Sequence, residues 1–165
     1  MGIILKARKY LNKKVLVNLY NTFVFPYLIY CAEVWGTACD KHLDPLVKFQ
    51  NKIIRIITFS PYLTSTAPIY LRLKILPLKK LITQRIGLQM FKYSTGSLPI
   101  VIHELFIDNQ SIHTHNTRNK SLLRQQVANR EYMYRNFSFV GVYIWNHIKS
   151  QTVINTVSKY CLSNL

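Results

Sequence analysis

Residues 44–61, DPLVKFQNKIIRIITFSP, carry the clearest helix signal in the sequence. Asp44 followed by Pro45 predicts the helix start, because a short acidic side chain caps free backbone N–H groups and Pro is tolerated at the first helical position. One face, at three- and four-residue spacing, carries the apolar residues Leu46, Phe49, Ile53 and Ile56. Another face, at spacings of four and three, carries Lys48, Lys52 and Arg55. Ser60-Pro61 ends the pattern, which therefore predicts an amphipathic helix with a basic stripe.

The residues that follow this helix predict a turn and a second long helix. Residues 61–68 are expected to form a turn, and residues 69–76, IYLRLKIL, fit either a strand or a short helix. After Pro77, residues 78–94 predict a helix that Gly96 and Pro99 close. Its apolar side is expected to consist of Leu78, Ile82, Ile86, Met90 and Tyr93.

The C-terminal third alternates between polar and apolar stretches. Residues 107–120 are polar and predict a loop, and residues 121–135 predict a polar, basic helix. Residues 138–148, SFVGVYIWNHI, predict an apolar segment packed on the core, and residues 153–165 predict a weak terminal helix. The expected fold class is therefore mostly α, a small helical domain with few or no strands.

The N-terminal stretch has two interpretations. Residues 1–14 contain five basic residues and no acid, and residues 15–32, VLVNLYNTFVFPYLIYCA, are almost entirely apolar or aromatic. A basic start before an apolar run is typical of a membrane anchor with its basic end in the cytoplasm. We favour a buried helix kinked at Pro26, because Asn18 and Asn21 are costly in lipid and Glu33 follows the run directly.

The charge balance points to an anionic partner. The chain has 22 Lys and Arg against 6 Asp and Glu, a net charge of +16, and no acid lies between Asp44 and Glu104. Nucleic acid is the commonest polyanion for such a chain, and an anionic membrane surface is the second. The three cysteines do not suggest a disulfide framework, so a reducing compartment, cytoplasmic or nuclear, is expected, with no clear secretory signal.

The sequence predicts no catalytic residues, no metal and no cofactor. A polymerase holds two metal ions with closely spaced carboxylates, and no two of the six acids are adjacent. Only Cys39-x2-His42, with Cys31 nearby, and His113-x-His115 have zinc-like spacing, and neither supplies four ligands with paired short spacings.

Several short motifs occur in an order that resembles one family. The first stretch, residues 19–36, is LYNTFVFPYLIYCAEVWG, in which the family shows Leu-Tyr, Pro, Tyr-Cys or Tyr-Gly, and Trp-Gly. The later matches are Leu43, Leu46, Gln50, Asn51, Lys52 and Arg55, then LRLKILPL at 71–78, Leu98-Pro99, HTHNTR at 113–118, and Gly141, Trp145 and Asn146. Over roughly residues 5–162 the chain resembles the C-terminal, thumb-side part of reverse transcriptases of non-LTR, Jockey-like retrotransposons.

The resemblance implies a role in RNA-directed DNA polymerisation without catalysis, because the family's fingers, palm and paired aspartates would lie before residue 1. It implies a thumb-like helical region over 1–106, a polar basic loop over 107–120, and a helical extension over 121–165 packed on the same core. The implied partners are template RNA or an RNA–DNA hybrid, and the palm and fingers of the same polymerase. The expected contact residues are Lys48, Lys52, Arg55, Lys79, Lys80, Arg85 and Arg118. Two alternatives stay open, a small membrane-anchored basic protein and a non-functional remnant of a decayed element.

Overall fold

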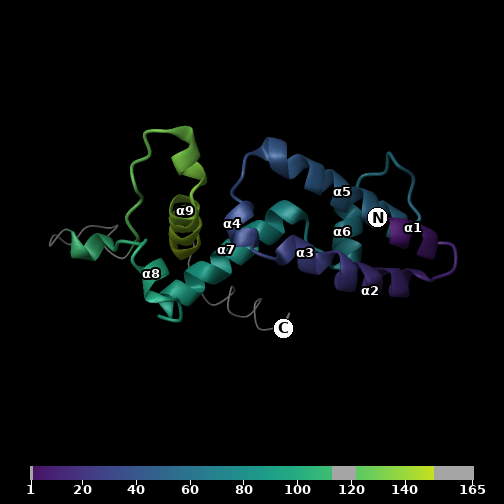
Figure 1. Ribbon diagram of the computed structural model, residues 1–165, viewed down its shortest axis with the longest axis horizontal. Helices are drawn as coiled ribbons and strands as arrows, with labels where there is room; N and C mark the ends of the chain where they lie inside the picture. Colours follow the sequence, from purple (N-terminus) through teal and green to yellow (C-terminus); the bar gives the residue numbers. More distant parts are fainter. Residues whose placement is uncertain (1, 113–121, 151–165) are drawn as a thin grey trace. The chain divides into compact units, whose positions relative to one another are not determined.

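The computed structural model describes residues 2–112 and 122–150, and these are mostly helical (Figure 1). Within those ranges the chain forms nine α-helices and two short 3-10 helices, and its one β feature is an isolated bridge between Asp108 and Leu123. The predicted mostly α class is therefore confirmed. The chain divides into two compact units, the first extending to Ile82 and the second beginning at Thr83.

The apolar run near the N-terminus forms two helices rather than one. After α1 (Gly2–Ala7), α2 (Lys13–Phe23) begins at Asn12, whose side-chain oxygen accepts a 3.0 Å hydrogen bond from the Val15 N–H. The helix breaks at Val24, and α3 (Phe25–Ile29) has Pro26 in its first turn. The buried positions recur every four residues, at Leu16, Tyr20, Val24, Leu28 and Ala32.

These positions confirm the buried, Pro-interrupted interpretation of residues 15–32. Pro26 has no N–H to offer the Thr22 carbonyl, so the helix is interrupted there while the stripe continues through the break. In the described parts of the chain, every helix is too short or too polar to cross a bilayer.

A tight turn links α3 to α4 (Ala32–Trp35). Cys31 adopts the left-handed conformation with a φ of 49°, and the indole Nε1 of Trp35 donates a 2.7 Å hydrogen bond to the Tyr30 carbonyl. At Gly36, a Cβ would collide with the Ala32 carbonyl and lie 2.5 Å from the Ile82 side chain. Residues 30–36 thus build a turn, and the left-handed conformation of Cys31 is one that Gly adopts without steric cost.

The central helix α5 (Asp40–Thr58) begins one turn earlier than predicted. The carbonyl of Cys39 accepts hydrogen bonds from His42 and Leu43, so Asp44 does not cap the helix and Pro45 lies inside it. Pro45 forfeits one hydrogen bond near the helix start, and burial of Leu43 offsets part of that cost. At the other end, Phe59 has a φ of 58° and the Ser60 N–H bonds the Arg55 carbonyl, which confirms a stop close to Ser60-Pro61.

A buried Gln50 connects α5 to the rest of the first unit. Its Nε2 donates to the Tyr20 hydroxyl at 2.9 Å and to the Leu76 carbonyl at 3.0 Å, and its Oε1 accepts from the Leu78 N–H at 2.8 Å. Burial raises the pKa of Tyr20, which therefore remains a neutral hydroxyl. The predicted apolar face omitted Gln50, which is 1% exposed and belongs to the face that carries Leu43, Ile53, Ile54 and Ile57.

The neighbouring Asn51 positions the next helix. Its Oδ1 accepts hydrogen bonds from the Tyr70 hydroxyl at 2.8 Å and from Thr66 Oγ1 at 3.2 Å. The sequence allowed either a strand or a short helix over residues 69–76, and the structure has a helix there, α6 (Ala67–Leu73). Its Ile69 and Tyr70 pack on Ile54. Lys74 ends α6 in the left-handed conformation with a φ of 55°.

The second long helix agrees with its prediction. Helix α7 (Leu78–Ser94) has the predicted bounds, and Gly96, with a φ of 68°, follows it. All five predicted inward residues are buried, Leu78, Ile82, Ile86, Met90 and Tyr93.

The second unit has its own apolar core. Buried Met90, Tyr93, Phe106, Leu123, Val142 and Trp145 form one cluster. It joins the end of α7 to α9 (Phe137–Ser150), with α8 (Ile100–His103) and the 3-10 helix η1 (Asn109–Ser111) between them in the chain. Residues of the predicted apolar segment 138–148 thus pack in this second core, and a Cβ at Gly141 would lie 2.8 Å from the Met90 sulfur.

The predicted helix over residues 121–135 is wrong for the part that the structure describes. Leu123 is extended and pairs with Asp108, and the Asn146 side chain bonds both the N–H and the carbonyl of Leu123. Only η2 (Glu131–Arg135) is helical there, as a 3-10 helix. The side chain of Asn146, which is distant in the sequence, thus supplies the hydrogen bonds that the extended backbone of Leu123 needs. The predicted loop at 107–120 is described only to Ile112, and the terminal helix at 153–165 lies outside the described residues.

We predict that Gln50→Leu destabilises the first unit by about 2–4 kcal/mol, because the buried Leu78 N–H, Leu76 carbonyl and Tyr20 hydroxyl lose a partner while volume is nearly kept. Urea unfolding followed by Trp35 fluorescence, in a Trp145→Phe background, measures this. The control Gln125→Leu, at an exposed position, should change stability by less than about 0.5 kcal/mol. Equal stabilities of the two variants would contradict the role of Gln50.

We also predict that Cys31→Gly is more stable than Cys31→Ala by about 0.5–1 kcal/mol. Gly adopts the left-handed conformation without the steric cost of about 1–2 kcal/mol that Ala has there. The greater flexibility of Gly in the unfolded chain offsets part of this gain in stability. The same pair at Val34, exposed within α4, should show the opposite order by about 1 kcal/mol. The same Trp35 unfolding measurement tests both pairs, and an Ala preference at both positions would refute the left-handed turn.

Candidate nucleic-acid interface

The basic stripe of α5 lies on its outer side. Lys48 and Lys52 are exposed, and Arg55 is half-buried. On the opposite side of the helix, Gln50, Ile53, Ile54 and Ile57 are buried. The prediction that these three cations lie on one face of the helix is confirmed, whereas their contact with nucleic acid stays a prediction.

Arg55 also holds the loop that follows α5. Its Nε donates a 2.9 Å hydrogen bond to the Thr64 carbonyl, and its guanidinium carbon lies 5.7 Å from the centre of the Tyr62 ring. Tyr62 itself is 75% exposed. Arg55 therefore has a structural task as well as a surface charge, and its guanidinium is held in a defined position.

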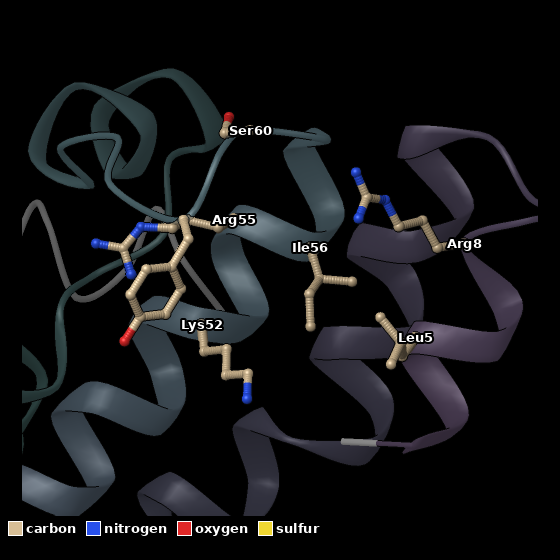
Figure 2. A pocket seen from close by; sticks show the side chains of 7 residues that line it. Leu5, Arg8, Lys52, Arg55, Ile56 and Ser60 are labelled. Atoms are coloured by element: carbon tan, nitrogen blue, oxygen red, sulfur yellow. The ribbon is translucent and has the colours of Figure 1, made fainter.

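A second arginine joins this surface from the turn that follows α1. The guanidinium carbon of Arg8 lies 4.6 Å from the centre of the Phe59 ring, just past the end of α5. Arg8 lines a surface cavity of about 260 Å³ together with Leu5, Lys52, Arg55, Ile56, Ser60 and Tyr62 (Figure 2). Sequence reasoning missed Arg8, because its distance along the chain from α5 gives no signal that the two segments pack together.

Lys79 has an acidic partner, although no acid lies between Asp44 and Glu104 in the sequence. Its Nζ lies 2.6 Å from Oδ1 of Asp40, at the start of α5. The hydrogen bond and charge of Asp40 raise the pKa of Lys79 above its ordinary value, and the Asp44 carboxylate acts in the same direction. Folding brings the acids of α5 to the start of α7, where they partly neutralise one of the predicted contact residues.

Of the remaining predicted contact residues, two lie in the described chain, one in each unit. Lys80 is exposed on the first turn of α7 in the first unit. Arg85 is half-buried on the same helix but belongs to the second unit. Arg118 lies outside the described residues. The structure thus brings together Lys48, Lys52 and Arg55 and adds Arg8.

Among the described residues the acids are not gathered into a group that could hold a metal ion. All six lie in the described ranges, where no three His, Cys, Asp or Glu side chains are grouped to hold a metal ion. Asp40 pairs with Lys79, and Glu131 pairs with Arg135 one helical turn away. His113 and His115, of the zinc-like spacing, lie outside the described residues.

Comparison with known proteins finds a related transposon protein. Over 72 residues the chain is 28% identical to a Drosophila melanogaster protein described as a probable RNA-directed DNA polymerase from transposon X-element. The match covers 44% of this chain and 8% of that protein, so the chain corresponds to a small part of it. No family model matches the chain, and no solved structure matches it. The sequence is thus related in part to a transposon-encoded polymerase.

We predict that Lys79 and Lys80 differ in their contribution to polyanion binding. Lys80→Gln should lower the slope of log affinity against log salt for an RNA duplex by about 0.7–0.9. Lys79→Gln should lower it by less than half as much, because Asp40 already compensates that charge. Fluorescence anisotropy at several salt concentrations measures both slopes. Equal losses for the two variants would contradict a lasting Lys79–Asp40 pair in solution.

Proposed function

We propose that this chain is a non-catalytic part of a retrotransposon RNA-directed DNA polymerase that grips template RNA or an RNA–DNA hybrid. The observation that carries the proposal is the outer face of α5, where Lys48 and Lys52 project opposite a buried face and Arg55 is fixed beside them. The partial similarity to a transposon polymerase and the net charge of +16 support the same assignment.

A rigid helix with regularly spaced cations suits a duplex whose sequence varies. An A-form duplex has a major groove too narrow for side chains and is held mainly through its phosphates and 2′-hydroxyls. Lys48 and Lys52 are one turn apart, about 6 Å along the helix axis, so both can face one phosphate backbone. Such contacts give affinity with little sequence preference, as a polymerase needs while its template moves through.

In this proposal catalysis belongs to another part of the polymerase. Magnesium-dependent nucleotide transfer needs carboxylates that converge on two metal ions. Two of the acids of this chain instead pair with basic side chains, Asp40 with Lys79 and Glu131 with Arg135. The paired aspartates would come from a palm domain, which together with the fingers is the proposed protein partner.

We predict that Lys48→Gln/Lys52→Gln weakens binding to RNA duplex and to RNA–DNA hybrid equally for different sequences. The slope of log affinity against log salt should fall by about 1.5, from two lost phosphate contacts. Circular dichroism should show unchanged helix content, because both side chains are exposed. Arg55 is left in place because its replacement would also release the Thr64 carbonyl.

A charge-matched control separates this face from general attraction. Lys92→Gln/Arg130→Gln removes the same charge from two exposed positions in the second unit. This control should lower the salt slope by less than half as much as Lys48→Gln/Lys52→Gln does. If both double variants lose the same slope, binding follows net charge alone and the assignment to α5 is wrong.

A further inference from the structure

The cavity beside α1 and α5 combines features that the duplex-gripping face does not need. Figure 2 shows Arg8 and Leu5 on one side of the view and Arg55 and Lys52 on the other, with Ile56 between them. The lining thus has an apolar floor with three cations around it, and it contains no carboxylate. Cations that line one cavity without an acid repel one another, so an anion bound there would stabilise the arrangement.

An aromatic ring stands beside these cations and outside the core. Tyr62 lies in the loop after α5, is 75% exposed and lines the cavity with its ring near the Arg55 guanidinium. An exposed ring next to phosphate-binding cations is how single-stranded nucleic acid is commonly held, because bases stack on the ring while the cations follow the backbone. A base within a duplex cannot do this, since its neighbours cover both of its faces.

The volume of the cavity is suited to a single nucleotide. Its volume of about 260 Å³ lies just below the range of roughly 300–1,000 Å³ that small-molecule sites occupy. That space suits one nucleobase with part of its sugar–phosphate, and it is too small for a base pair.

We propose that this cavity takes one unpaired nucleotide of a single strand. Its base stacks on Tyr62, on the side of Ile56 that Lys52 and Arg55 line, and its phosphate lies on the other side, beside Arg8. This proposal rests on the proposed function, because it uses the same cationic face, and it adds a contact for single-stranded template next to the gripped duplex. Arg55 acts as a positioning residue that keeps the Tyr62 loop in place through the Thr64 carbonyl.

The test compares Tyr62→Leu and Tyr62→Phe in the full chain, with a fluorescent 12-nucleotide uridine strand and a blunt RNA duplex as probes. Tyr62→Leu keeps an apolar side chain beside Arg55 but has no aromatic face, so its affinity for the single strand should fall roughly tenfold. Its salt slope should not change, because no cation is lost. Tyr62→Phe keeps the aromatic face and should bind the single strand within about twofold of the parent.

The duplex and inorganic phosphate identify which part of the ligand is recognised. Duplex affinity should be the same in all three proteins, and Arg8→Gln should lower the single-strand salt slope by about 0.7. Millimolar inorganic phosphate should displace the single strand only as strongly as an equal ionic strength of chloride does. Stronger displacement by phosphate would mean that the cavity is an anion site without base recognition, and the nucleotide proposal would be overturned.

The remaining outcomes separate this proposal from the proposed function. If Tyr62→Leu leaves single-strand affinity unchanged, or weakens duplex and single strand alike, the nucleotide site is refuted while duplex gripping by Lys48 and Lys52 stands. If the parent chain binds the duplex no better than the Lys48→Gln/Lys52→Gln variant does, the proposed function fails, whatever Tyr62 does to the single strand.

Discussion

The amide of Gln50 sets the register of the first unit. Its Nε2 donates hydrogen bonds to the Tyr20 hydroxyl on α2 and to the Leu76 carbonyl just before α7. Its Oε1 accepts one from the Leu78 N–H at the start of α7. Residues two before and two after it, Lys48 and Lys52, lie about 160° around the helix from it. Fixing Gln50 inward therefore fixes both lysines outward, and the cationic face is a geometric consequence of one buried hydrogen-bonded side chain.

The Gln-Asn-Lys-x2-Arg pattern of α5 thus combines two tasks in six residues. Gln50 and Asn51 connect the helix to α6 and α7, and Arg55 holds the loop at Thr64. Lys52 is exposed and lines the cavity. A pattern that resembles a nucleic-acid-binding family is therefore explained largely by folding, so binding must be argued from the outward cations and not from the motif as a whole.

The sequence predicted most reliably where local patterns decide the structure. Helix α7 has a regular apolar repeat between Pro77 and Gly96, and its bounds and buried side follow from them. Predictions failed where a distant residue decides, because spacing along the chain does not show it. Asn146 holds Leu123 extended, and packing of α1 on α5 brings Arg8 to the cavity.

Three cations of the first unit have neighbours of two different kinds. Lys79 lies against the Asp40 carboxylate, which cancels much of its field. Arg8 and Arg55 lie near the rings of Phe59 and Tyr62, where a cation–π contact is worth about 0.5–1 kcal/mol at an exposed site and leaves the positive charge in place. Rings therefore ease the desolvation of these arginines without neutralising them. A phosphate that approaches α5 meets their full charge, whereas one that approaches Lys79 meets a pair, so the attraction is focused on the cavity side of α5.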